Sequence, residues 1–271
     1  NIIPALGQIP ADRFEDVVAA ARSLFTDSMV GHDKASIISA LREVPADQLK
    51  DMVTKAQSLF TDRMNGNDRQ FIISALRKVP ADRLEAVVKA AQSLVTDRMD
   101  GSDRQWIISA LVEIPANRLE AVVKAAQSLV TDRMNRSERT IIISAFAKVP
   151  ADRIEDIVSV ARSLSLDETS ASVKASLISA LEEVPVERFE VVVKATQHLN
   201  RNNMDVGKWI EILSTLRKVR ADQLEDMVAK AQRLVTDHID GYDAVKIISA
   251  LGEIPIAVSY THLTLPTILL V

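Results

Sequence analysis

Apolar residues recur at steps of three and four along almost the whole chain. In residues 80–114 a first set comprises Leu84, Val87, Val88, Ala91, Leu94 and Val95. A second set comprises Ile107, Ile108, Leu111 and Ile114. This spacing places each set on one face of an α-helix. The pattern therefore predicts two amphipathic helices that are joined by a short polar turn.

Residues around the two apolar sets indicate where these helices begin and end. Pro80 suits the first position of a helix, where a missing N–H costs nothing, and Asp82 then faces the positive end of the helix dipole. We expect Gly101 to end the first helix, because glycine accepts the left-handed conformation found at many helix ends. Ser102 or Asp103 is expected to cap the second helix.

The two-helix pattern returns every 35 residues without insertion or deletion. A proline marks the start of each copy, and Arg220 occupies the place where one proline is missing. The prolines of this series are Pro10, Pro45, Pro80, Pro115, Pro150, Pro185 and Pro255. A fixed period of this length is typical of tandem-repeat proteins. It predicts helices near residues 46–63 and 68–78, and at each 35-residue step from them.

Two helices of this kind cannot bury their apolar faces alone, whereas stacked pairs share one continuous core. We therefore expect an all-α fold, a right-handed αα-solenoid of about seven two-helix repeats, over residues 1–255. Residues 1–9 form a partial repeat, since Ile2–Leu6 matches the apolar stretch of a second helix. The full repeats start at residues 10, 45, 80, 115, 150, 185 and 220.

Residues 256–271 leave the repeat pattern. Their segment VSYTHLTLPT, residues 258–267, resembles a translated sequencing adaptor of the sort found at the ends of shotgun-assembled reading frames. We interpret this tail as non-native, and the chain as a metagenomic fragment of a longer array. The alternative is a native tail with a preference for β structure.

Composition narrows the function classes. The net charge of −4 produces no field that would attract nucleic acid or an anionic membrane. The chain holds no cysteine, which excludes disulfides and thiolate metal sites and fits a reducing compartment. We see no secretion signal and no run of the ~18 apolar residues that a membrane-spanning helix needs. These features favour a cytoplasmic protein without a membrane partner.

The sequence offers no constellation of catalytic or metal-binding residues. The histidines occupy unrelated repeat positions: His32, His198, His238 and His262. The acidic turns at residues 65–68, 100–103 and 240–243 faintly resemble calcium loops, but they lack the bidentate glutamate that such a loop needs. We interpret them as helix-linking turns. No enzyme activity, cofactor, metal or small-molecule substrate is expected.

The most variable pair of positions precedes the paired apolar residues of each second helix. In three successive repeats this pair comprises Gln70, Phe71, Gln105, Trp106, Thr140 and Ile141. A helical projection places both members away from the apolar face. Large rigid side chains on a polar surface are typical of binding hot spots, so we predict a contact surface for a protein or peptide here. The alternative is that these side chains fill gaps between adjacent repeats.

A second register is basic. It comprises Lys34, Arg69, Arg104, Arg139 and Lys174, with Arg63, Arg98 and Arg133 six residues before its middle members. Such a line of cations could follow the phosphates of single-stranded nucleic acid. An acidic residue precedes most members of this register, however, which favours a self-paired, solvated ladder. We therefore keep nucleic-acid binding as the alternative function.

A third register alternates in sign from one repeat to the next. It comprises Glu43, Lys78, Glu113, Lys148, Glu183, Lys218 and Glu253. If the repeats stack in parallel, each charge faces its opposite on the next repeat. We interpret this register as structural, with at most ~1 kcal/mol of stabilisation from each exposed pair.

Residues 1–255 resemble the α-solenoid group that includes HEAT, tetratricopeptide and Pumilio-type repeats, and their period equals that of pentatricopeptide repeats. The stretch from Asp97 through Gly101 to Ser109 is loosely similar to the Pumilio repeat motif, with Ser109 where the base-reading glutamine would be. The resemblance extends to the group and to no single family. It implies a non-enzymatic scaffold that binds a protein or peptide along one face of the superhelix.

Overall fold

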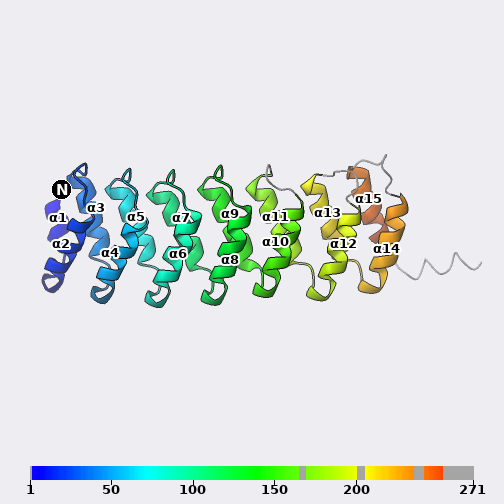
Figure 1. Cartoon of the computed structure of the whole chain (residues 1–271), viewed down its shortest axis with the longest axis horizontal. Coiled ribbons are helices and arrows are strands. Elements are labelled where there is room, and N and C mark those ends of the chain that lie inside the picture. The colour runs from blue at the N-terminus through cyan, green and yellow to red at the C-terminus, as the bar shows by residue number, and fades with distance from the viewer. Residues whose placement is uncertain (1, 165–168, 200–204, 235–240, 253–271) are drawn as a thin grey trace, which may run out of the picture. The chain divides into compact units, whose positions relative to one another are not determined.

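The chain is all-α. The computed structural model describes residues 2–164, 169–199, 205–234 and 241–252, and these residues contain helices and no strand. The helices alternate between two sets along the chain (Figure 1). None of the described helices is both long enough and apolar enough to cross a membrane.

Helices of the first set each follow a residue of the proline series. They are α2 (Phe14–Ser23), α4 (Leu49–Gln57), α6 (Leu84–Leu94), α8 (Ala116–Leu129), α10 (Ile154–Ser163), α12 (Phe189–Leu199) and α14 (Ala221–Leu234). A three-residue 3-10 turn, such as Ala81–Arg83 before α6, precedes five of them. The proline lies one residue before this turn with an extended ψ of 141° at Pro80, so the prediction of a proline at the first helical position is wrong.

Helices of the second set begin at intervals of 35 residues, as the starts of α3 and α5 at residues 31 and 66 show. They are α3 (Gly31–Leu41), α5 (Gly66–Leu76), α7 (Gly101–Val112), α9 (Arg136–Lys148), α11 (Ala171–Glu182), α13 (Val206–Leu216) and α15 (Gly241–Gly252). Helix α1 (Ile2–Leu6) precedes them and packs on α3. The predicted spacing of the helices is therefore confirmed.

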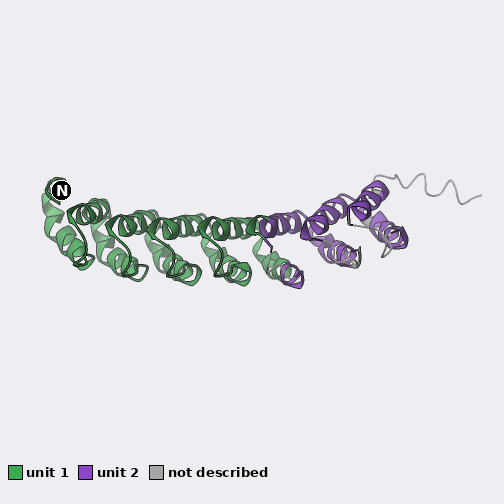
Figure 2. Cartoon of the chain, turned by 90° about the horizontal axis from the view of Figure 1, so that it is seen from above, with its two compact units in different colours: residues 1–158, 170–172 green, residues 159–169, 173–271 purple. Residues whose placement is uncertain are grey.

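The chain divides into two compact units (Figure 2). Unit 1 comprises residues 1–158 and 170–172; in it, each of α3, α5 and α7 packs on the next helix of the second set and on its own first-set partner. Unit 2 comprises residues 159–169 and 173–271; in its described part, α12 packs on α13 and α14, and α15 packs on α13 and α14. Within each unit, contacts therefore join helices that are neighbours in the series.

The apolar faces predicted from the sequence form the core. In α6 the side chains of Leu84, Val87 and Leu94 are at most 1% exposed, and in α7 Ile107, Ile108 and Leu111 are fully buried. This burial confirms the inward faces assigned to both helices. The tail at residues 256–271 lies outside the described residues, as do His238 and His262.

Glycine has a different place in the turn from the one predicted. Gly101 begins α7 rather than ending α6, and Asp100 caps α7 by accepting a hydrogen bond from the Asp103 N–H at 2.8 Å. The N–H of Gly101 also donates to Asp68 Oδ1 on α5 at 3.1 Å. A Cβ at residue 101 would lie 2.1 Å from the Asp68 carbonyl oxygen. This position therefore needs glycine for close approach of two helix N-termini.

Candidate binding surface

Three large apolar side chains are exposed at one register of neighbouring helices. Phe71 on α5, Trp106 on α7 and Ile141 on α9 are 40%, 56% and 42% exposed. Each is the sixth residue of its helix, and α7 packs against both α5 and α9. These helices run in the same direction within unit 1 (Figure 1). The three residues therefore occupy equivalent places on adjacent helices. We call Phe71, Trp106 and Ile141 the apolar row.

Uncharged polar side chains surround the apolar row. Gln70, Gln105 and Thr140 are half-buried beside it, and the Thr140 hydroxyl donates to the Arg136 carbonyl oxygen at 2.8 Å. Ser36 occupies the position of the row on α3, 35 residues before Phe71. Its Oγ donates to Asn67 Oδ1 on α5 at 3.0 Å. Ser102 and Ser137 occupy the register of Asn67 on the next two helices. The surface around the row is therefore rich in hydroxyl and amide groups.

The basic register lies inside the protein, and the prediction of a solvated ladder is wrong for its middle members. Arg69, Arg104 and Arg139 are 7%, 4% and 4% exposed, and Lys174 is 1% exposed. Lys34 is half-buried, with its ammonium group 5.6 Å from the ring centre of Phe25. Side chains in these positions do not present a line of cations to a phosphate backbone.

The buried arginines bind backbone carbonyl groups instead. Arg104 donates through Nη1 to the Leu59 oxygen at 3.0 Å, through Nη2 to Thr96 at 2.9 Å and through Nε to Met99 at 3.3 Å. Arg139 repeats this arrangement on the oxygens of Leu94, Thr131 and Met134. The carbonyl groups at the end of a helix lack partners within that helix. Each arginine therefore joins its own helix to the end of a first-set helix in the preceding 35-residue segment.

Burial also changes the ionisation of these side chains. Desolvation lowers the pKa of Arg69, Arg104 and Arg139, and the charges of Asp62, Asp97 and Asp132 oppose this shift. Asp62, Asp97 and Asp132 lie in the turns before α5, α7 and α9. From there they act on the buried arginines through space.

A second group of arginines was not singled out from the sequence. Arg83, from the turn before α6, donates to the carbonyl oxygens of Val112, at 3.0 Å, and Ile114 at the end of α7. Arg13, Arg118 and Arg188 bind the ends of α3, α9 and α13 in the same way. A cation at this end complements the helix dipole. The return of arginine at this place in five of the seven repeats, with Gln48 and Gln223 in the other two, is the signal that could reveal it.

Glutamates of the sign-alternating register form ion pairs with the next segment, but the cation is not the one that the sequence predicts. Glu43 forms an ion pair with Arg77, one residue before the expected Lys78. In unit 2, Glu183 pairs with Arg217 rather than Lys218. Glu43 and Glu183 are each about half exposed, so these pairs contribute little stability.

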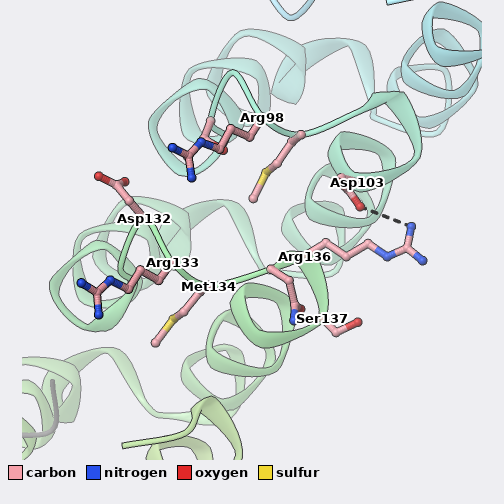
Figure 3. Close-up of a pocket in the computed structure, with 10 residues that line it drawn as sticks. Arg98, Asp103, Asp132, Arg133, Met134, Arg136 and Ser137 are labelled. Atoms are coloured by element: carbon pink, nitrogen blue, oxygen red, sulfur yellow. Dashed lines mark ion pairs between the residues drawn. The ribbon is translucent and has the colours of Figure 1, made fainter. Parts of the chain in front are cut away.

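A depression of about 460 Å³ lies between the N-terminal ends of α7 and α9 and the turns that precede them (Figure 3). It is lined by Thr96, Arg98, Met99, Asp103, Asp132, Arg133, Met134, Asn135, Arg136 and Ser137. An ion pair of 3.3 Å joins Arg136 Nη1 to Asp103 Oδ1. Within the described part of the chain, no group of three or more His, Asp or Glu side chains is placed to hold a metal ion.

Three comparisons with known proteins were made with the whole sequence. It matches no protein-family model, and no curated protein or solved structure is significantly similar to it. The interpretation of the surface therefore rests on its residues.

Proposed function

We propose that the chain is a non-enzymatic scaffold that binds a peptide segment of a partner protein along the apolar row. In this proposal the helix pairs form a right-handed α-solenoid of about seven repeats within residues 1–255, as the 35-residue period suggests. The observation that carries the proposal is the exposure of Phe71, Trp106 and Ile141 at one register of three adjacent helices. Tryptophan and other large side chains dominate the energetics of protein interfaces.

The spacing of the row suits an extended peptide. Neighbouring helix axes lie ~8–10 Å apart, so the row extends over roughly 16–20 Å. A polyproline II chain advances about 3.1 Å per residue with three residues per turn, so every third side chain would meet one member of the row. Hydroxyl and amide groups beside the row, such as those of Ser102 and Gln105, can bind the peptide backbone. We expect a segment of about six or seven residues with apolar side chains.

The alternative, binding of single-stranded nucleic acid, loses its main support because the basic register is buried. It becomes an outcome of the same test. Binding through phosphates would weaken steeply with salt, by a log–log slope of about −0.7 per contact on single strands. Binding through the apolar row would depend only weakly on salt.

The test begins with peptides selected on the full chain from a random display library, followed by anisotropy titrations. Trp106→Ala should weaken binding by about 30-fold or more, since loss of a hot-spot side chain costs ~2 kcal/mol or more. Tyr242→Ala is the matched control, because Tyr242 is equally exposed, at 56%, but lies on α15. Equal affinity of the wild type and Trp106→Ala would contradict the proposal, as would salt-sensitive, sub-micromolar binding of a generic oligonucleotide.

A further inference from the structure

The depression between α7 and α9 lies beside a residue that departs from the 35-residue pattern. Glycine begins α5 and α7, whereas arginine begins α9 at the equivalent residue 136. The N–H groups of Gly66 and Gly101 each bind an aspartate of the preceding helix at 3.1 Å. A Cβ at either glycine would come within 2.4 Å of the backbone of that aspartate. Because Arg136 carries a Cβ, α9 cannot approach α7 at this residue as closely as α7 approaches α5.

The side chain of Arg136 remains at this opening. Its Nη1 binds Asp103 Oδ1 at 3.3 Å and donates to Ser102 Oγ at 3.0 Å (Figure 3). The side chain is 41% exposed, so donors on its guanidinium group stay open to solvent. Ser102 lies four residues before Trp106 on α7, and residues at this spacing share one face of a helix. Ser102, which accepts the hydrogen bond from Arg136, is thus about one helical turn, ~6 Å along the axis, from the residue at the centre of the apolar row.

Positive charge exceeds negative charge in the depression, although the chain as a whole carries −4. Arg98, Arg133 and Arg136 line it, against Asp103 and Asp132. Arg98 and Arg133 are exposed, and among the described contacts neither forms an ion pair. Figure 3 shows both guanidinium groups away from the Asp103–Arg136 pair. These two side chains are therefore available to an anionic group.

We infer that the partner segment is acidic, with an Asp or Glu carboxylate in this depression and an apolar side chain on Trp106. The inference rests on the proposed function, whose peptide it specifies. A guanidinium group binds a planar carboxylate through two parallel hydrogen bonds. A carboxylate carries one negative charge, so Asp103 and Asp132 repel it less than they would repel a doubly charged phosphate. The required ligand is therefore a peptide that combines a carboxylate with apolar residues.

The test uses the peptides selected on the full chain, each also synthesised with Glu→Gln or Asp→Asn. We expect the amide forms to bind about tenfold more weakly or worse, as for loss of a charged hydrogen bond. This difference should disappear in the Arg98→Gln/Arg133→Gln double variant. Arg63→Gln is the matched control, because Arg63 is exposed in the same place of the preceding turn and lies outside the depression.

A further variant, Arg136→Gly, restores the residue that begins α5 and α7 and should close the depression. It should keep the helical spectrum of the wild type and lose the preference for acidic peptides. Circular dichroism and the same titrations measure both effects.

The outcomes separate the two proposals. Peptides that need Trp106 but tolerate both the amide change and the double variant would overturn the acidic partner and leave the scaffold proposal intact. Peptides that are indifferent to Trp106→Ala would overturn both. Displacement of the peptide by inorganic phosphate at a much lower concentration than acetate would overturn the carboxylate assignment.

Discussion

Gly66 and Gly101 occupy the tightest contacts between adjacent helices of the second set. Both glycines donate their N–H groups to an aspartate side chain, and neither site leaves room for a Cβ. Gly31 has the same place at the start of α3, but a Cβ there would meet no atom within 4 Å. The three glycines therefore share a sequence position and differ in their surroundings.

This difference predicts opposite effects of the same substitution. Gly101→Ala should lower the free energy of unfolding by ~1–3 kcal/mol or more, because overpacking displaces backbone. Gly31→Ala should raise it by up to ~1 kcal/mol, because alanine is the better helix former. Urea unfolding followed by circular dichroism measures both. A similar response of the two variants would show that the α5–α7 contact is not as close as described.

Arg104 gives a second prediction for a single residue. Arg104→Ala removes three hydrogen bonds to carbonyl groups and should cost about 2–4 kcal/mol, since bonds to charged groups are the stronger kind and their energies are not additive. Arg98→Ala, in the same segment, removes an exposed side chain and should change stability by less than ~0.5 kcal/mol. Comparable urea midpoints for the two variants would contradict the structural role assigned to Arg104.

The role of these arginines could not be read from spacing alone. Prediction of a solvated ladder paired each one with the acidic residue immediately before it. Adjacent residues lie about 100° apart on a helix and do not face each other. In the structure Asp68 instead accepts hydrogen bonds from the N–H groups of Asn65 and Gly101, and the guanidinium groups bind carbonyl oxygens of another segment. The partners in other segments are distant in sequence, so only the fold reveals them.

At the level of helices, periodicity predicted the existence, spacing and inward faces of the elements, while their ends were misplaced. The helix predicted near residues 46–63 is longer than the observed one, since α4 spans Leu49–Gln57 after a 3-10 turn. Pro80 is extended and precedes the 3-10 turn that leads into α6, whereas Gly101 begins α7 and meets Asp68. Burial follows the helical period, so the sequence predicts it. The residues at which a helix begins and ends depend instead on contacts with neighbouring segments.

Two leucines at one register position test the inward face of the first-set helices. Leu94 is 1% exposed in α6, and its equivalent Leu234 is 50% exposed at the end of α14. Leu94→Ala should lower the free energy of unfolding by ~2–5 kcal/mol. Leu234→Ala should cost less than ~1 kcal/mol, since exposed changes have small effects. An unchanged denaturation midpoint for Leu94→Ala would contradict the assigned core.

The candidate site, too, is predicted from the sequence only in part. Variation at one register identified Phe71, Trp106 and Ile141 from the sequence, and the structure exposes all three. The depression was not predicted, because Arg136 is informative only once Gly66 and Gly101 are seen to touch the preceding helices. The change from glycine to Arg136 can be interpreted only when the contact made by the usual glycine is known.

At the scale of the whole molecule, the hydrogen bonds described between segments of unit 1 join nearest neighbours in the 35-residue series. Gly66 binds Asp33, Gln57 binds the Ser23 carbonyl oxygen at 3.1 Å, and Arg69 binds that of Leu24 at 2.8 Å. Similar contacts follow one segment later, where Gly101 binds Asp68 and Arg104 binds Leu59. Stability in such an arrangement is approximately a sum of segment and nearest-neighbour terms.

This additivity predicts that a whole segment can be removed. Deletion of residues 45–79 brings Gly101 to Asp33 and Arg104 to Leu24, which are the contacts that Gly66 and Arg69 made before. The shortened chain should keep its helical circular dichroism per residue and unfold cooperatively in urea. Deletion of residues 84–88 removes five residues from α6 and places later residues on the wrong face, since five residues are not a whole number of turns of 3.6 residues. That smaller deletion should abolish cooperative unfolding. Equal collapse of both shortened chains would contradict nearest-neighbour stacking, and with it the proposed solenoid.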